Sequence, residues 1–391
     1  MSSIDFDVAI VGAGPAGATA AWDLARNGRR VVLFEKQRLP RYKTCGGGVV
    51  VRARGWLPPL DDAVFESTNA RASLHLLRGD GRELDFEPRE PIPVSLAMRA
   101  TLDHALVETA VRAGATVRDG VEVRECVDSD GVLLATSRGA VRARVLLVAD
   151  GATGSTARRA GWTEAHSGVA ALEWELETDA ATQTRWRDRA RFDFGDVDRG
   201  YAWVFGKRER LSVGILTTVR GHAALARELE RYLARLAIVP TAVQRHGYVI
   251  PLAPRPEGVA RGPVLLLGDA AGLADPITAE GISHAAHSAR LAARALAESG
   301  DRVDELARRY RALVNEHVLA DLVWARRLAR VLYRRSTREW LFERFGNELV
   351  DAMGDVIAGR TSYRALLTDP RHYWRALRIR LGLARKVSRA P

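Results

Sequence analysis

Short apolar runs that stop at a glycine or an acidic residue recur along this chain, and they predict buried strands. The runs cover residues 6–11, 31–34, 146–149 and 264–267, and they are followed by Gly12, Glu35, Asp150 and Gly268. Ligands of open α/β sheets bind beyond the carboxyl ends of the strands. We therefore expect binding chemistry at these four strand ends.

Other segments have the patterns of helices and of a second sheet. Helices are expected at residues 16–26, 97–113, 221–236 and 278–298 and over most of 303–391. Apolar and aromatic runs separated by turn signals predict an antiparallel sheet from residues 168–178, 189–195, 200–206 and 211–218. Short strands are expected at 121–127, 131–136 and 141–149, and residues 40–60, rich in glycine, proline and arginine, are expected to form a loop.

The first strand leads into a glycine-rich loop, Gly12-Ala13-Gly14-Pro15-Ala16-Gly17. In such a loop Gly12 permits the tight turn, Gly14 lets the backbone approach a pyrophosphate, and Gly17 lets the helix pack against the strand. The helix then presents free N–H groups to the phosphates. Glu35, 18 residues after Gly17, suits a ribose with free hydroxyls, and Ala16 and Lys36 adjoin these positions. A chance GxGxxG is the alternative, but strand, helix, second strand and acid all stand where a dinucleotide site needs them.

A second signal, more than 250 residues later, narrows the dinucleotide to FAD. The strand at 264–267 ends in Gly268-Asp269-Ala270-Ala271-Gly272, and Gly281-Ile282 then opens a helix. Gly268-Asp269 resembles the third motif of the glutathione-reductase-type flavoproteins, in which the aspartate meets the ribityl chain. A flexible polyol of this kind needs a fixed acceptor, and the resemblance implies that Asp269 supplies it. The N–H groups at Gly281 and Ile282 can face the electron-rich edge of a flavin ring.

These segments define an α/β protein with a discontinuous Rossmann-type FAD-binding domain. We expect that domain at residues 1–165 with 245–300, and an inserted, mainly antiparallel β-sheet substrate domain at 166–244 with part of 50–95. A C-terminal helical region is expected at 301–391.

Composition points to a reducing compartment. Among 391 residues there are two cysteines, Cys45 and Cys126, so no disulfide framework is evident. The first residues lack the basic and apolar regions of a secretory signal, and no apolar run reaches the ~18 residues of a spanning helix. The expected location is the cytoplasm.

The net charge of +11 is concentrated toward the C-terminus. Residues 301–391 hold 20 basic and 11 acidic side chains, and residues 371–391 hold seven basic side chains and no acid, interleaved with apolar ones such as Trp374 and Leu377. One interpretation is a basic amphipathic segment on anionic lipid at the inner face of the membrane. The others are an arginine-rich solvated helix face and nucleic-acid binding, which we do not expect here.

Several motifs resemble those of known flavoproteins. Asp150-Gly151 after a strand resembles the Asp-Gly motif of the hydroxybenzoate-hydroxylase branch of glutathione-reductase-type flavoproteins, and Arg99 resembles that group's pyrophosphate arginine. An Asx turn and a surface Arg99–Asp103 pair are the structural alternatives. Three longer matches resemble the geranylgeranyl reductase family: Lys43 to Gly48 (its Cys-Gly-Gly loop), Tyr201 to Lys207 (its YxWxFPK box) and Gly268 to Ile282.

The resemblance implies that the chain binds FAD and saturates carbon–carbon double bonds in prenyl chains. It places Cys45, Gly46, Gly48 and Val123 beside the cofactor and Tyr201, Trp203 and Phe205 on the substrate wall. Two positions depart from the family pattern. Gly206 replaces a proline, which could loosen a pocket strand, and Ala279 replaces a glycine, which implies that this position need not take a positive φ.

Alkene reduction needs a hydride from the flavin and a proton for the other carbon. Cys45 is the candidate proton donor or alkene-positioning residue, although a buried cysteine can be an apolar filler. His284 and His287 are expected to serve packing. With no second GxGxxG and no metal set, NAD(P)H would dock transiently, or a ferredoxin-like protein would be the electron donor. A flavin monooxygenase of an aromatic or lipophilic substrate and a non-catalytic, flavin-bearing lipid-binding protein are the alternatives.

Overall fold

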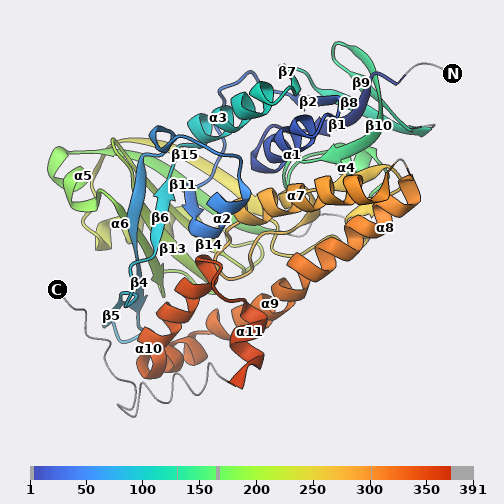
Figure 1. Ribbon diagram of the computed structural model, residues 1–391. Helices are drawn as coiled ribbons and strands as arrows, with labels where there is room; N and C mark the ends of the chain where they lie inside the picture. The colour runs from blue at the N-terminus through green and yellow to red at the C-terminus, as the bar shows by residue number, and fades with distance from the viewer. Residues whose placement is uncertain (1–3, 130, 164–167, 301, 371–391) are drawn as a thin grey trace, which may run out of the picture.

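The protein consists of two sheets joined by helices along one side (Figure 1). The computed structural model describes residues 4–129, 131–163, 168–300 and 302–370. The α/β class expected from the sequence, with an FAD-binding fold, an antiparallel sheet and a helical C-terminal region, is confirmed.

The first sheet is the dinucleotide-binding sheet, and its central strands are parallel. Its strand order is β16-β17-β10-β1-β2-β7, and β9 pairs with both β10 and β8. The bounds are β1 (Phe6–Val11), β2 (Val31–Glu35), β7 (Thr116–Asp119), β8 (Val123–Ser129), β9 (Gly131–Thr136), β10 (Gly139–Val148), β16 (Ala260–Arg261) and β17 (Val264–Leu266). In register, Ile10 lies beside Leu33 and Leu147, and Leu147 lies beside Leu265. The four apolar runs of the sequence are therefore neighbouring buried strands whose ends meet at one edge.

The second sheet is antiparallel except for the pairing of β12 with β4. Its order is β15-β11-β14-β13-β12-β4-β6-β3, with β5 paired to β4. The bounds are β3 (Gly48–Val50), β4 (Ser67–Leu77), β5 (Glu83–Phe86), β6 (Pro93–Leu96), β11 (Val169–Thr178), β12 (Arg189–Phe194), β13 (Gly200–Gly206), β14 (Leu211–Thr217) and β15 (Pro240–Ile250).

Alternate residues of the second sheet face different surroundings, as strand geometry requires. Trp174, Val204 and Ile215 point to one face, where they pack with Leu229 and Tyr232 of α6. Tyr201, Trp203 and Phe205 point to the other face. That second face is the one turned toward the nucleotide-binding part of the molecule.

The helices form two groups. Their bounds are α1 (Pro15–Arg26), α2 (Val51–Trp56), α3 (Arg99–Arg112), α4 (Thr156–Arg159), α5 (Ala180–Trp186), α6 (Leu225–Arg235), α7 (Ile282–Ser299), α8 (Val303–Val314), α9 (Ala320–Leu332), α10 (Arg335–Ile357) and α11 (Tyr363–Thr368). Helix α1 packs between α3 and α7 beside the first sheet. The later helices, orange and red in Figure 1, run from α7 along the molecule to α10, which contacts β4 and β5 of the second sheet.

Two boundaries differ from those expected. Residues 245–250 belong to β15 and pair with β11 of the second sheet, so the chain returns to the first sheet only after Ile250. Residues 40–60 are not all loop, because β3 and α2 lie at 48–56. Strand β3 is only three residues long, and its partner β6 supplies the pairing that its own sequence does not signal.

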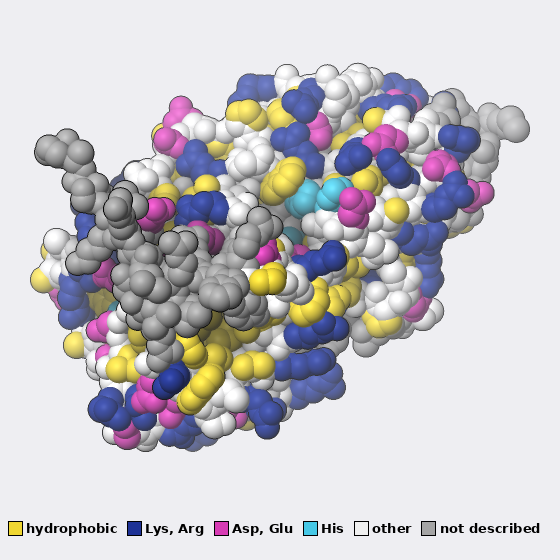
Figure 2. All heavy atoms as spheres, turned by 60° about the horizontal axis from the view of Figure 1, so that its bottom comes forward, with side chains coloured by type: hydrophobic (Ala, Val, Ile, Leu, Met, Phe, Trp, Pro, Cys, Tyr) yellow, Lys and Arg dark blue, Asp and Glu magenta, His cyan; other side chains and the backbone are white. Residues whose placement is uncertain are grey.

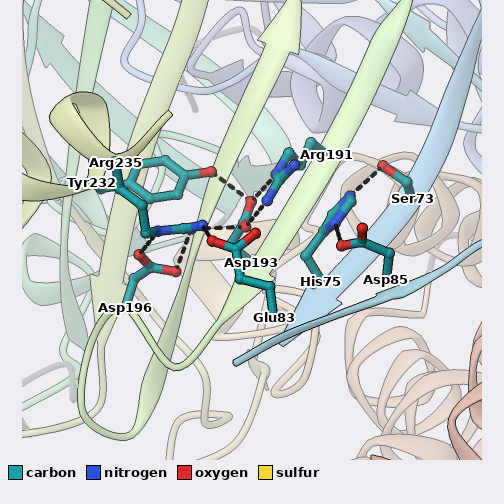
Figure 3. A network of polar contacts seen from close by, with 9 residues as sticks. All are labelled: Ser73, His75, Glu83, Asp85, Arg191, Asp193, Asp196, Tyr232 and Arg235. Carbon is teal, nitrogen blue, oxygen red and sulfur yellow. Dashed lines mark hydrogen bonds and ion pairs between the residues drawn. The ribbon is translucent and has the colours of Figure 1, made fainter. Parts of the chain in front are cut away.

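A buried polar network fastens α6 to the second sheet (Figure 3). Asp193 of β12 accepts hydrogen bonds from Arg191 at 2.7 Å through both carboxylate oxygens, from the Tyr232 hydroxyl at 2.7 Å, and from Arg235 at 3.0 Å. Arg235 also pairs with Asp196 at 2.8 Å. Burial alone would raise the pKa of the Asp193 carboxyl, but Arg191 and Tyr232 more than offset that effect and lower it. The carboxylate therefore stays ionised and bonded to the helix.

Candidate functional site

A cavity of about 530 Å³ lies between the two sheets and is lined by both of them. This volume is within the range of small-molecule sites. All but one of the site residues expected from the sequence line it. They are Gly12, Gly14, Ala16, Glu35, Lys36, Cys45, Gly46, Gly48, Arg99, Val123, Asp150, Tyr201, Trp203, Phe205, Asp269, Gly281 and Ile282.

The exception, Gly17, lies behind the glycine loop, where a side chain would not fit. A Cβ atom at Gly17 would lie 1.9 Å from the Gly12 carbonyl oxygen, and one at Gly12 would lie 2.4 Å from the Ala149 carbonyl oxygen. The lack of a side chain at both positions therefore lets the start of α1 lie close to the ends of β1 and β10. No side chain caps α1, so the N–H groups of its first turn remain available to a phosphate.

A chain of buried charges connects the ribose end of the site to α3. Glu35 accepts hydrogen bonds from the Ala13 N–H at 3.2 Å and from Arg41 Nε at 3.1 Å. Arg41 also reaches Asp103 at 2.8 Å, and Asp103 accepts two bonds from Arg99 at 2.8 and 2.9 Å. The Arg99–Asp103 pair is thus buried and not a surface pair. Asp103 fixes the guanidinium of Arg99 at the cavity wall, near Gly14.

Asp150 closes the cavity at the end of β10. Its Oδ2 accepts a hydrogen bond from the Thr156 N–H at 3.0 Å, and its buried Oδ1 has no partner among the described residues. Burial raises the pKa of this carboxyl, and the bonds from Thr156 oppose the shift. An unpartnered buried oxygen that faces a cavity is a site for a ligand donor.

Asp269, at the end of β17, lies against the turn that opens α7. A Cβ atom at Gly281 would be 3.0 Å from Asp269 Oδ1. Burial raises the pKa of Asp269, while Lys43 and Arg99 act in the opposite direction. Lys43 was not among the expected site residues, and its Nζ lies 3.2 Å from the centre of the Tyr248 ring. Burial, followed by repulsion from Arg99, lowers the pKa of Lys43 to about 8.

The Cys-Gly-Gly loop lies directly on the aromatic residues of β13. A Cβ atom at Gly46 would be 2.8 Å from the Phe205 ring and 2.9 Å from Trp203 Nε1. Two motifs that are about 155 residues apart in sequence are therefore packed face to face. Cys45 Sγ accepts a hydrogen bond from the Gly47 N–H at 3.4 Å, and its thiol lies near Arg99. Tyr201 donates a hydrogen bond to the Thr278 carbonyl.

The two departures from the family pattern have structural consequences. Ala279 has a φ of 54°, so the inference that this position need not take a positive φ was wrong. Bonds from the Thr278 and Ile277 N–H groups to Asp275 Oδ1 fix the turn that imposes this conformation, at a steric cost to alanine. Gly206 does not loosen β13: it pairs with Leu211, and a Cβ there would lie 1.7 Å from the Trp186 carbonyl oxygen.

His284 and His287 lie on α7 as packing groups. His287 stacks on Trp56 with ring centres 3.9 Å apart. Burial, followed by the neighbouring His284, lowers the pKa of His287 to about 3, and burial also lowers the pKa of His284. Both imidazoles are neutral at physiological pH.

A buried acid pair at the cavity was missed by the sequence reasoning. Glu173 of β11 lines the cavity, and Glu175 lies two residues further along the same face of the strand. Lys207 Nζ contacts Glu175 Oε1 at 3.1 Å. An apolar strand interrupted by two acids at an i, i+2 spacing was the available signal, because alternate strand residues share a face.

These side chains fit FAD. The glycine loop offers a cradle that a Cβ atom would fill, Arg99 and the start of α1 offer donors to a pyrophosphate, and Glu35 retains acceptor capacity for ribose hydroxyls. Asp269 is beside the turn at Gly281, as a ribityl acceptor must be if the N–H groups of α7 face the flavin. Fold and site together define the class: a flavoprotein of the glutathione-reductase type.

Comparisons with known proteins agree. Residues 5–194 match a family model described as an FAD binding domain. The chain is 33% identical over 350 residues to menaquinone reductase of Mycolicibacterium smegmatis, covering 83% of this chain and 84% of that protein. It is 32% identical over 300 residues to geranylgeranyl diphosphate reductase of Rhodobacter capsulatus, covering 74% of each. A crystal structure of a geranylgeranyl bacteriochlorophyll reductase-like protein from Thermoplasma acidophilum superposes with a TM-score of 0.74 at 20% identity, covering 95% of this chain and 96% of that one.

The chain belongs to the geranylgeranyl reductase family, and it is an FAD-dependent oxidoreductase. Over the ranges that the structure describes, no three His, Cys, Asp or Glu side chains are grouped to hold a metal ion. None of the described helices has the length and apolar character needed to cross a membrane.

Proposed function

We propose that this protein saturates carbon–carbon double bonds in the prenyl chain of a lipid, a quinone or a chlorophyll-like substrate. The observation that carries the proposal is the packing of the Cys-Gly-Gly loop on Trp203 and Phe205, inside the cavity that also contains the dinucleotide cradle. An aromatic wall suits a flexible apolar chain. The names of the relatives, a menaquinone reductase and a geranylgeranyl diphosphate reductase, support this substrate class.

The side chains around the cavity would align the substrate and exclude water. FAD, once reduced, supplies the hydride for one alkene carbon. Tyr201, Trp203 and Phe205 would hold the chain against the flavin, since they are buried and their rings contact one another. Asp269 and Arg99 would hold the ribityl and pyrophosphate parts. Fixing two reactants in contact is a large part of the barrier reduction that such a site can provide.

Cys45 would position the alkene. It lines the cavity where the Cys-Gly-Gly loop contacts the aromatic wall. We expect Cys45→Ala to keep its flavin and to change the turnover several-fold or the double bond that is reduced, as measured by product analysis. Cys126→Ala is the matched control, because Cys126 lies outside the cavity lining. Unchanged kinetics and products in Cys45→Ala would leave this residue as an apolar filler.

The reductant would be NAD(P)H docking transiently or a ferredoxin-like protein. The net charge of +11 favours an acidic protein donor by electrostatic attraction. The two are separated by whether NAD(P)H alone reduces the bound flavin under anaerobic conditions. Reduction by NAD(P)H at a rate above turnover would make a protein donor unnecessary.

We place the encounter with the lipid substrate at the inner face of the membrane. The basic segment 371–391, which was interpreted as an amphipathic segment on anionic lipid, lies outside the described residues. Within the described chain, exposed apolar side chains on α9 and α10, Val323, Val331 and Trp340, support the idea, and Figure 2 shows apolar surface on this side of the molecule with basic side chains around it. Co-sedimentation with anionic but not neutral vesicles, lost on removal of 371–391, would support it.

The proposed function is tested by mass spectrometry of the lipid-soluble fraction of cells with and without the gene. A gain of two hydrogen atoms per double bond in one prenyl lipid, present only with the gene, would identify a reductase and its substrate together. A gain of one oxygen atom would show a monooxygenase. No change in any prenylated compound would contradict the proposal.

A further inference from the structure

Glu173 has the position of a reacting group. It is 2% exposed, it lines the cavity, and its Oε1 has no hydrogen-bond partner among the described residues. Its Oε2 accepts a hydrogen bond from the Tyr42 hydroxyl at 3.5 Å. The N–H of Cys45 lies close to the carboxylate as well. A buried, incompletely bonded carboxyl is costly, so its retention beside a substrate cavity needs a reason.

Strand register places Glu173 at the end of the aromatic wall. Glu173 of β11 is paired with Gly214 of β14, and Gly214 is paired with Trp203 of β13. Side chains in one row across a sheet point to the same face. A Cβ atom at Gly214 would lie 2.0 Å from the Trp203 indole, so the indole lies over this glycine, on the side toward Glu173. The carboxyl and the proposed substrate wall are thus neighbours on one surface.

Charge balance around Glu173 requires a bound proton. Glu173 and Glu175 are close enough to share a hydrogen bond, and Glu175 is 3% exposed. Lys207, 1% exposed, donates to Glu175 Oε1 at 3.1 Å, and the Ser212 hydroxyl donates to the same atom at 2.6 Å. One lysine can balance one of the two acids, and Lys207 contacts Glu175 and not Glu173, so the proton is assigned to Glu173. Two adjacent buried carboxyls do not both ionise.

We propose that Glu173 is the proton donor of the reductase reaction, which makes this inference rest on the proposed function. Glu173 gives its proton to one carbon of the double bond as the other carbon receives the hydride supplied by reduced flavin. The π bond is broken, two C–H bonds are formed, the alkene is reduced and the flavin is oxidised. Glu173 is left as a carboxylate and regains a proton through the hydroxyl of Tyr42, which is partly exposed. A nicotinamide or ferredoxin-type donor would supply the two electrons needed for the next turnover.

The pKa of Glu173 agrees with this role. Burial, followed by repulsion from Glu175, raises it to about 8, and Lys207 opposes the shift. The other ionisable groups around Glu173 are Tyr42 and Cys45, at the Cys-Gly-Gly loop, and His246 of β15. His246 is paired with Glu173 across the sheet and stacks on Tyr42. Glu173 is therefore mostly protonated at neutral pH. Its pKa is also near the pH at which the reaction would run, which is where a general acid is most effective.

The test compares Glu173→Gln with Glu175→Gln and with Glu177→Gln, a control on the same strand whose side chain is exposed. In single turnovers from reduced flavin, we expect Glu173→Gln to slow alkene reduction by about 100-fold or more while flavin content and flavin reduction stay as in the wild type. Glu175→Gln removes the like charge, so the alkaline limb of its pH profile should move to lower pH. Glu177→Gln should behave as the wild type.

A second readout needs neither flavin nor substrate. Infrared spectra of the protein at neutral pH should contain the carbonyl stretch of a protonated carboxylic acid that is lost in Glu173→Gln and kept in Glu177→Gln. Its absence from the wild type, or full single-turnover rates in Glu173→Gln, would overturn the donor role and leave the reductase intact. A wild-type protein that reduces no prenyl chain would instead overturn the proposed function, and the donor role with it, whatever the infrared result.

Discussion

At the residue scale, we expect cofactor binding to depend strongly on Asp269, which lines the cavity. Its carboxylate lies against the Gly281 turn, at the edge where the two halves of the nucleotide-binding fold meet. We expect Asp269→Ala to purify largely without flavin, because the ribityl chain loses its fixed acceptor. The measurement is the ratio of flavin absorbance to protein absorbance. Full flavin occupancy in a folded variant would show that this aspartate is misassigned.

Substitution of Gly46 tests the contact between the Cys-Gly-Gly loop and the aromatic wall. A methyl group there would press on both Phe205 and Trp203, so Gly46→Ala should displace the loop and lower turnover at least tenfold. Gly55→Ala is the matched control, since no atom lies within 4 Å of a Cβ at that position. The two variants are compared in substrate turnover at equal flavin content. Equal turnover in the two variants would show that the packing of the Cys-Gly-Gly loop on the aromatic wall does not matter for the reaction.

The Tyr232 hydroxyl links a helix to a strand. Removing it in Tyr232→Phe takes one donor from the ionised Asp193 carboxylate and should lower the free energy of unfolding by about 1–3 kcal/mol. Urea denaturation measures the change. Combining it with Asp193→Asn should give less than the sum of the single effects, because the two side chains share one bond. Additive effects would show that the network in Figure 3 does not hold α6 to the sheet.

Contiguous motifs made the nucleotide-binding elements predictable. The GxGxxG loop, Glu35, Asp150 and Asp269 each follow a buried strand, and parallel strands bring such ends to one edge. Four of the nine strands of the second sheet, β11 to β14, were also located within a residue or two, because turns separate them. The other strands of this sheet, β3 to β6 and β15, and helix α2 were missed. Strand β3, for example, is held by its pairing with β6, which its own short sequence does not signal.

The rest of the site could not be predicted, because residues far apart in sequence form it. The row Glu173–Gly214–Trp203 exists only once β14 is placed between β11 and β13. The chain from Glu35 through Arg41 to Asp103 joins residues 68 positions apart. The backbone of Ala279 was misjudged because the turn is set by Asp275 and not by the residue itself. Strand register and side-chain contacts of this kind cannot be predicted from the local sequence.

The molecule as a whole should be most stable in mildly acidic solution. Glu173 has a folded-state pKa of about 8, above its unfolded value of 4.5, so the folded state holds the extra proton and stability falls as pH rises between these values. His287 has a folded-state pKa of about 3, below its unfolded value of 6.5, so stability falls as pH drops through this range. Above pH 6.5 the contribution of His287 to stability no longer changes, so the loss of stability from Glu173 is not offset.

Thermal unfolding between pH 6.5 and 8.5 measures this effect. We expect the wild-type Tm to fall by a few degrees over this range and the Tm of Glu173→Gln to change less, because glutamine has no proton to lose. Glu177→Gln should follow the wild type, since that side chain is exposed. Parallel curves for all three proteins would contradict the assignment of a buried proton to Glu173.

The central claim is that one cavity brings a reduced flavin and a prenyl double bond into contact. Its most direct test is anaerobic: the protein is loaded with FAD, reduced, mixed with a prenylated quinone or lipid, and followed by flavin absorbance and product mass. We expect the flavin to be reoxidised in step with the appearance of a product carrying two added hydrogen atoms. A flavin that stays reduced with every prenyl chain, and is reoxidised only when oxygen is admitted, would contradict the account.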